Sequence, residues 1–206
     1  MADNKLLESF GVYTPEGFLT PGFNDHYLFF VGRDDVHSIL LTLISNEKLE
    51  IDFNMFGFDD DTLNQAIITK MKDPSIVVKG TLDKSQAGGV HEKKLLALDE
   101  TNDPNFLNSI AIGQSATHQI SHTKGAVLVG QGVWFEGSTN WSNSGEGTGI
   151  SLKADIKNPV GWSAQNNTLL VSVNPVGMSR FKTQLAAEHL IAVKQKGDII
   201  KISQIR

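Results

Sequence analysis

Residues 122–146 read HTKGAVLVGQGVWFEGSTNWSNSGE, a stretch in which a turn separates two short apolar runs. Two glycines bracket the turn at 130–132, so the stretch predicts two antiparallel strands that form a β-hairpin. His122 and Lys124 stand two residues apart at the start of the first strand, and their side chains therefore point to the same face. Asn140 lies just past the end of the second strand, and the hairpin brings it close to both.

The residue types at these positions suit a phosphodiester substrate. An imidazole, here His122, can attack phosphorus or transfer a proton. An ammonium and a carboxamide, here Lys124 and Asn140, can hold the phosphoryl oxygens as charge builds on them. Gly137 permits a close backbone approach at the end of the second strand. The same set is a poor metal site because lysine is not a usual ligand, so we expect no metal and no other cofactor.

Apolar periodicity in the rest of the chain predicts an α/β domain. Acidic residues precede two of the expected helices, and a proline at 175 precedes the last. Helices are expected near 33–44, 59–71 and 90–98, and in a long stretch through 181–191. Strands are expected at 49–55, 76–78, 110–112 and 169–173, and the tail at 198–205 alternates like a final strand. This order favours a mixed β-sheet flanked by helices on both faces.

Length and composition limit the class of protein. The chain has 206 residues and a mass of 22.5 kDa, about the size of one domain. We expect that domain at 31–206, after an N-terminal extended arm at 1–30 that is rich in glycine, proline and aromatic residues. No cysteine is present, which excludes a disulfide framework, a thiolate zinc site and a cysteine nucleophile. The net charge of −5 argues against a surface coated in positive charge, although a local basic groove stays open.

The sequence shows no sign of export or membrane insertion. No apolar run approaches the roughly 20 residues that a membrane span needs. The N-terminus lacks the basic region and apolar core of a signal peptide. We therefore expect a cytoplasmic protein that does not contact a membrane.

The order and spacing of these motifs resemble the signature of the phospholipase D superfamily, which is His-x-Lys, four residues, Asp, about six residues, then Gly-Ser-x-Asn. His122, Lys124, Gly137, Ser138 and Asn140 match it. Taken alone, each motif also fits a surface histidine or an ordinary turn. Residues 141–146 and 165–175 also look like superfamily sequences, though less specifically. The resemblance as a whole covers about 30–195.

The resemblance implies a phospholipase D-like domain that works without metal through a phosphohistidine. His122, Lys124, Asn140 and Ser138 are the expected catalytic residues. We expect Lys124, Asn140, Ser142 and Trp141 to bind the substrate.

Two positions depart from the signature. The family aspartate falls at Val129, whose side chain cannot accept hydrogen bonds, so its role must be supplied elsewhere or be missing. Small nuclease-like members also carry a carboxylate before the next strand to orient the histidine. Here an insertion at 147–164 lengthens that region, and Asn166, or its neighbour Asn167, occupies the expected place. Glu146 is the alternative orienting group, unless it is a solvated charge that caps a helix.

A single copy of the motif implies a symmetric homodimer. The superfamily mechanism uses two histidines, and only His122 has the companion residues, so two copies would face each other across the active site. Single-motif members resemble nucleases. Our leading hypothesis is therefore a nuclease that cleaves DNA, with RNA as a second candidate substrate. Sequence specificity would then come from a partner or a larger assembly. The alternatives are a phospholipase D or phosphatidyl transferase that acts on lipids, and a non-catalytic homologue that binds nucleic acid or a partner protein.

Overall fold

The computed structural model describes residues 7, 12–14, 17–19, 22–23, 25–99, 109–148 and 163–204. A mixed sheet of eight strands forms the centre of the domain, in the order β3-β4-β10-β9-β8-β5-β6-β7. Strands β5, β6 and β7 run parallel to one another, and the other pairs are antiparallel. The eight strands are β3 (Gly22–Phe23), β4 (His26–Phe30), β10 (Thr168–Ser172), β9 (Val133–Gly137), β8 (Lys124–Leu128), β5 (Glu50–Met55), β6 (Val77–Asp83) and β7 (Ile110–Gly113). A separate antiparallel pair, β1 (Val12–Thr14) and β2 (Gly17–Leu19), lies in the N-terminal segment.

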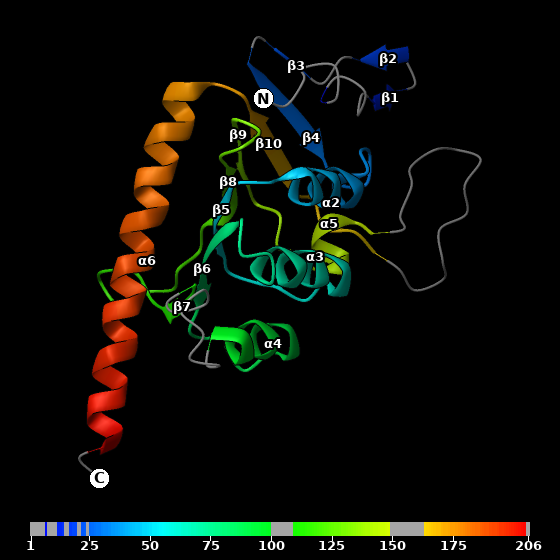
Figure 1. Cartoon of the computed structure of the whole chain (residues 1–206). Coiled ribbons are helices and arrows are strands. Elements are labelled where there is room, and N and C mark those ends of the chain that lie inside the picture. The colour runs from blue at the N-terminus through cyan, green and yellow to red at the C-terminus, as the bar shows by residue number, and fades with distance from the viewer. Residues whose placement is uncertain are drawn as a thin grey trace.

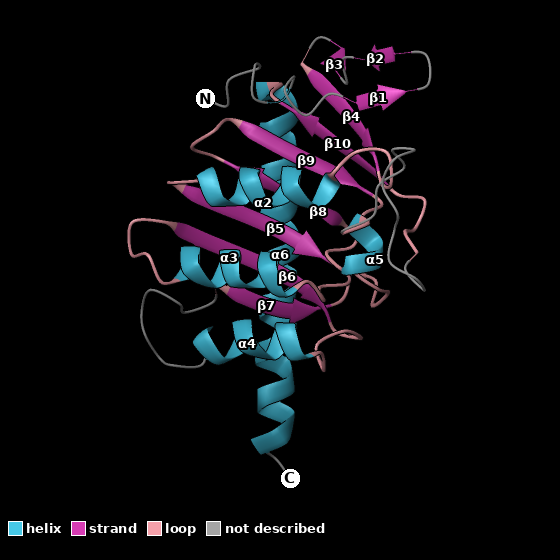
Figure 2. Cartoon of the chain, turned by 90° about the vertical axis from the view of Figure 1, so that its right-hand side faces the viewer, coloured by secondary structure: helices cyan, strands magenta, loops and turns pink. Residues whose placement is uncertain are grey.

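Helices cover both faces of the sheet, as the sequence predicted. Three helices, α2 (Val36–Asn46), α3 (Asp61–Met71) and α4 (Val90–Asp99), lie on one face (Figures 1 and 2). The long helix α6 (Pro175–Gln204) crosses the other face, where it contacts β5 to β9. A short helix, α5 (Asn143–Glu146), follows β9 at one edge of these layers. Among the helices of the described part, none is both long and apolar enough to cross a membrane.

Local sequence signals explain where α2 and α3 begin. Asp35 and Asp60 are their N-caps, and each side chain accepts a hydrogen bond from a backbone N–H of the first turn. The buried residues of α2 recur three and four positions apart, so one face of the helix packs on the sheet. Those residues are Val36, Ile39, Leu40, Leu43 and Ile44.

Two expectations about the ends of the chain need correction. The tail at 198–205 is not a strand, because α6 continues through Gln204. The β-branched residues of this tail favour a strand in the sequence, but the helix continues past Gly197 into it without a break. The expected boundary at residue 31 also divides the sheet. Strands β3 and β4 precede this boundary, and β4 lies between β3 and β10 in the eight-stranded sheet. Within the rest of the expected arm, β1 and β2 pair with each other, and the residues between the described ranges lie outside the described part of the chain.

The predicted hairpin is confirmed, and its register fixes the location of the motif residues. Strands β8 and β9 pair antiparallel, with Gly125 opposite Glu136. Strand β8 also pairs antiparallel with β5, which sets Lys124 opposite Met55. The end of β5, the start of β8 and the end of β9 therefore meet at one edge of the sheet. We call this edge the motif edge.

The opposite end of the hairpin contains Val129 and a buried carboxylate. Val129 follows β8, one strand length away from Lys124, and its N–H donates to the Glu50 carbonyl. Glu47, which is fully buried, accepts hydrogen bonds there from the backbone N–H groups of Gly130 and Gln131. The same carboxylate accepts bonds from the backbone at 48–50. Glu47 thus caps the hairpin turn, beside the position where the superfamily signature has its aspartate.

Candidate functional site

His122 and Lys124 lie against the same aromatic ring at the motif edge. The ring belongs to Phe56, which directly follows β5. The His122 imidazole meets it edge to face, with ring centroids 4.7 Å apart and planes at 67°. The Lys124 Nζ lies 5.1 Å from the centre of the same ring, a cation–π distance. The two side chains therefore lie together, as expected, although His122 precedes β8, and Phe56 is a neighbour that the motif did not predict.

The Lys124 ammonium is buried while the His122 ring is exposed. Lys124 is only 5% exposed, and its Nζ donates to the His122 carbonyl oxygen at 2.9 Å. Burial lowers the pKa of the Lys124 ammonium from its ordinary value. The Lys124 charge thus lies between the His122 carbonyl oxygen and the Phe56 ring. Of the two motif residues, His122 is the more exposed to solvent.

Hydrogen bonds fix the backbone just before His122. The Ser121 N–H donates to Asp83 Oδ2 at 2.5 Å, at the end of β6. The Asn54 side chain on β5 donates to Ser121 Oγ at 3.0 Å. Two central strands therefore hold the loop that presents His122.

Asn140 is held by a second pairing at the motif edge. The segment around Phe58 and the segment around Trp141 form a parallel bridge, in which Trp141 N–H donates to Gly57 O at 2.9 Å and Asp59 N–H donates to Trp141 O at 2.6 Å. Gly57 permits this approach, since a Cβ there would lie 3.2 Å from Asn140 Cγ. The Asn140 Oδ1 is buried and has no hydrogen-bond partner among the described residues. An unpaired amide oxygen is costly, and a bound group could satisfy it.

Two cavities open beside these residues. One of about 480 Å³ has Phe56, Asn140 and Ser142 in its wall, together with the buried carboxylate of Glu92. Burial raises the pKa of Glu92, although the N–H groups of Glu92 itself and Phe58 bond to it. The other cavity, of about 350 Å³, has His122 in its wall. Phe56 contacts His122 and also lines the Asn140 cavity, so it connects the two halves of the motif.

Two expected site residues have contacts within the fold. Trp141 is 1% exposed and stacks on Phe53 at 5.4 Å in the aromatic core, so the expectation that it binds substrate is wrong. The parallel bridge to Phe58 turns its side chain inward. Ser138 joins β9 to β10: its Oγ donates to Asn167 Oδ1 at 3.0 Å and accepts from Thr168 N–H at 3.0 Å. Gly137 packs on the same Thr168, as its predicted close approach requires.

Ser142 and Asn166 differ in their relation to the site. Ser142 is the N-cap of α5, where its Oγ accepts from Gly145 N–H at 3.2 Å, and it also lines the Asn140 cavity. Asn166 is exposed, and no hydrogen bond of its side chain is seen within the part of the chain that the structure describes. An orienting role toward His122 therefore remains a proposal.

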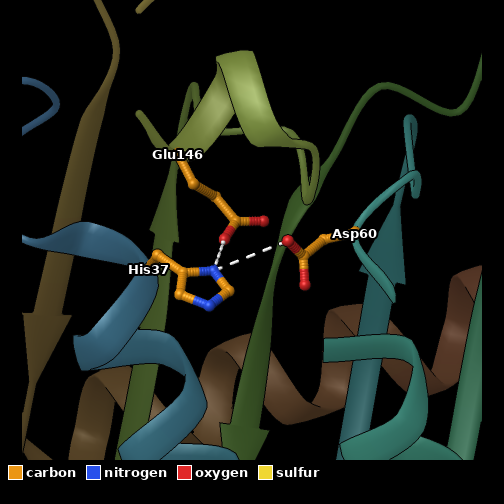
Figure 3. Close-up of side chains that lie close together, drawn as sticks. All are labelled: His37, Asp60 and Glu146. Atoms are coloured by element: carbon orange, nitrogen blue, oxygen red, sulfur yellow. Dashed lines mark hydrogen bonds and ion pairs between the residues drawn. The ribbon is translucent and has the colours of Figure 1, made fainter. Parts of the chain in front are cut away.

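Glu146 pairs with a different histidine. Figure 3 shows its carboxylate above His37, whose Nδ1 lies 2.6 Å from Glu146 Oε2 and 3.6 Å from Asp60 Oδ2. Glu146 is 1% exposed, so the alternative of a solvated charge is wrong. Burial raises its pKa to about 7, although the hydrogen bond from His37 opposes the rise. The same hydrogen bond raises the pKa of His37.

Comparison with known proteins supports the fold assignment. No protein-family model matches the sequence, and no curated protein matches it significantly. The structure is similar to NucT from Helicobacter pylori, with a TM-score of 0.57 and 16% identity over 81% of this chain and 96% of that one. Nuc from Salmonella typhimurium, a phospholipase D family member, matches with a TM-score of 0.55 and 14% identity, over 81% of this chain and 96% of that one. TrmBL2, an archaeal chromatin protein with a novel mode of DNA binding, matches with a TM-score of 0.51 and 12% identity, over 79% of this chain and 51% of that one. The chain therefore has the phospholipase D superfamily fold that its hairpin motif predicts.

Proposed function

We propose that this protein is a metal-independent phosphodiesterase whose reacting groups are His122, Lys124 and Asn140. The observation that carries the proposal is the packing of the His122 imidazole and the Lys124 ammonium on Phe56, which also lines the Asn140 cavity. A nucleophile, a cation and a carboxamide are thus available at one edge of the sheet.

The proposed reaction has two steps. A ring nitrogen of His122 attacks phosphorus, the bond from phosphorus to the leaving oxygen breaks, and a second histidine gives its proton to that oxygen. Water then attacks the phosphohistidine, the second histidine takes a proton from the water, and the phosphorus–nitrogen bond breaks. Lys124 and Asn140 stabilise the charge on the oxygens that do not leave.

The second histidine comes from another copy of the chain in this proposal. Two other histidines of the chain are already engaged: His37 bonds to Glu146, and His91 Nε2 lies 2.8 Å from Asp61 Oδ1. His122 is exposed, as a ring that meets a twin across a symmetry axis must be in the separate protomer. We therefore infer a symmetric homodimer with the active site at the interface.

A nucleic acid is the substrate class that we favour, with DNA before RNA. The fold similarity to TrmBL2, described as a DNA-binding chromatin protein, supports this choice. The net charge of −5 and the acidic Glu92 in the Asn140 cavity disfavour a broad polyanion-binding surface. Strand and sequence preference would come from a partner or a larger assembly.

A plasmid-nicking assay in EDTA tests the proposal. We expect wild type to nick DNA in EDTA and His122→Ala to be inactive. His26→Ala is the matched control, because His26 is an exposed histidine on β4, and it should behave as wild type. Hydrolysis of phosphatidylcholine vesicles without nicking would instead indicate a lipid enzyme. Binding of DNA without turnover on DNA, RNA or lipid would indicate a non-catalytic homologue.

A mixing experiment tests the shared active site. Sedimentation velocity should show a dimer, and excess His122→Ala protein should form mixed dimers with wild type. Because each mixed dimer lacks one histidine, activity should fall far below the value expected from dilution alone. A monomer, or activity that is indifferent to the added variant, would contradict the dimeric site.

A further inference from the structure

A compact set of possible ligand atoms lies behind the motif edge, separate from His122. His37 comes from the first turn of α2, Asp60 from the N-cap of α3 and Glu146 from α5. One nitrogen of His37 and one carboxylate oxygen from each acid lie within 4.8 Å of one another. Figure 3 shows both carboxylates facing the same ring nitrogen. Three segments far apart in sequence thus converge on one point.

The hydrogen bonds within this set leave one buried atom without a partner. Glu146 is only 1% exposed, and its Oε1 has no hydrogen-bond partner among the described residues. The Asp60 carboxylate is also buried, at 2% exposure, and its charge repels that of Glu146. With an imidazolium between two carboxylates the set has a net negative charge, which is costly in a buried place.

We propose that His37, Asp60 and Glu146 form a binding site for one divalent transition-metal ion. With a neutral imidazole, two carboxylates and a dication balance to zero net charge. One nitrogen and two oxygens suit Zn²⁺, and open positions remain for water.

The spacing fits this ion after a small movement. Two ligands on one tetrahedral zinc ion lie roughly 3.4 Å apart, given metal–ligand distances near 2.1 Å. His37 Nδ1 and Asp60 Oδ2 are 3.6 Å apart, close to that value. His37 and Glu146 are 2.6 Å apart because they share a hydrogen bond, so the ion would displace that proton, and Glu146 could offer its unpaired Oε1.

The surroundings would orient the ligands and admit the ion. Asp60 Oδ1 accepts a hydrogen bond from Leu63 N–H at 2.7 Å, which fixes the carboxylate. The His37 side chain is 14% exposed and offers a route from solvent. Such an ion would brace the Asn140 loop against α2 and α3, since Glu146 ends the short helix that follows this loop. It would not touch phosphorus, so the site does not depend on the proposed phosphodiesterase.

Calorimetric titration with Zn²⁺ tests the site. Protein stripped with EDTA and exchanged into chelator-free buffer should bind one equivalent of Zn²⁺ tightly and release protons. His37→Gln and Glu146→Gln should each weaken that binding by about a hundredfold, since each removes a direct ligand. His91→Gln is the matched control. His91 also lies between two carboxylates, those of Asp59 and Asp61, but both are largely exposed, and its loss should leave the tight site intact.

The outcomes separate clearly. Tight binding that survives both His37→Gln and Glu146→Gln, or that disappears in His91→Gln, would overturn the proposal, as would the absence of a tight site in wild type. Circular dichroism of the metal-free variants reports whether they fold. If they do not, NMR of wild type decides, because the His37 ring resonances must shift with the first equivalent of Zn²⁺. Cleavage of DNA in EDTA is measured separately, and either result can fail without the other.

Discussion

Replacing Glu47 should destabilise the hairpin that carries the motif. Its Oε1 accepts from the backbone N–H groups of Leu49 at 2.7 Å, Lys48 at 2.9 Å, Gly130 at 2.9 Å and, more weakly, Glu50 at 3.3 Å. The turn at Gln131 adds its backbone N–H at 3.2 Å and its side-chain amide at 3.3 Å, both to Oε2. One buried carboxylate thus joins the end of α2 to the β8–β9 turn.

The size of the effect follows from the donors left unpaired. A buried donor without a partner costs about 1–3 kcal/mol, and water can reach some of these groups after truncation. We therefore expect Glu47→Ala to lower the free energy of unfolding by about 3–5 kcal/mol, as for the breaking of a buried charged network. Glu47→Gln retains one acceptor oxygen without the charge, and should cost about 1–2 kcal/mol.

Urea unfolding followed by circular dichroism measures this cost. The exposed Glu136 on β9 gives the matched control, and Glu136→Gln should stay within about 0.5 kcal/mol of wild type. If Glu47→Ala lowered the free energy of unfolding by less than about 1 kcal/mol, the reasoning would be refuted, because several buried N–H groups without partners must cost more than that.

The same carboxylate gives a pH dependence with a defined sign. Burial alone would raise the pKa of Glu47, but hydrogen bonds from Leu49, Lys48, Gln131 and Gly130 outweigh it and hold the pKa below the ordinary 4.5. Its ionised form therefore stabilises the fold at all pH values above about 4.5, and this contribution is lost as the pH falls through the depressed pKa. The stability gap between wild type and Glu47→Gln should be constant near neutral pH and shrink in acid. A gap that grows in acid would contradict the assignment.

Three further predictions concern the motif edge. Lys124→Ala and Asn140→Ala should each lower the rate of plasmid nicking by about a hundredfold or more, as the loss of a single charge-stabilising donor does, and full activity in either would remove its assigned role. Phe56→Leu should release the Lys124 ammonium from its ring and loosen His122, so kcat should fall with little change in KM, whereas an unchanged kcat would show that the ring only fills space. Val129→Asp should leave the nicking rate unchanged, because residue 129 lies at the far end of β8; a rate gain would show that a carboxylate there acts on the chemistry.

Much of the fold follows from local patterns in the sequence. The apolar spacing in α2 predicted the helix because its buried face repeats with the helical period. The alternation of apolar and polar residues in β5 predicted the strand, although both of its faces are buried between the helices. His122 and Lys124 contact the same ring, as expected, but β8 begins at Lys124 and His122 lies in the loop before it, so strand alternation alone does not account for the position of His122. The tail at 198–205 shows the limit, since β-branched residues gave a strand pattern within a continuous helix.

The unpredicted parts of the site come from contacts between distant segments. Glu47 and Gly130 are 83 positions apart, and His37 and Glu146 are 109 apart, so no local pattern joins them. Trp141 was misassigned for the same reason. It follows the motif asparagine directly, but its burial depends on the bridge to Phe58, which a sequence pattern does not show. Phe56 stands just past an apolar strand, and only the register of β5 against β8 sets it beside Lys124.

Val129, where the superfamily signature has its aspartate, lies far from the residues of the proposed chemistry. A strand of the length of β8 spans about 15 Å, so residue 129 and the His122 ring lie at opposite ends of the hairpin. At the turn end Glu47 already supplies a buried carboxylate to the backbone of Gly130 and Gln131. An argument for an inactive homologue must therefore come from the motif edge, where buried Glu92 shares a cavity with Asn140. A carboxylate there would repel a phosphodiester unless it is protonated, and burial raises the pKa of Glu92 in that direction.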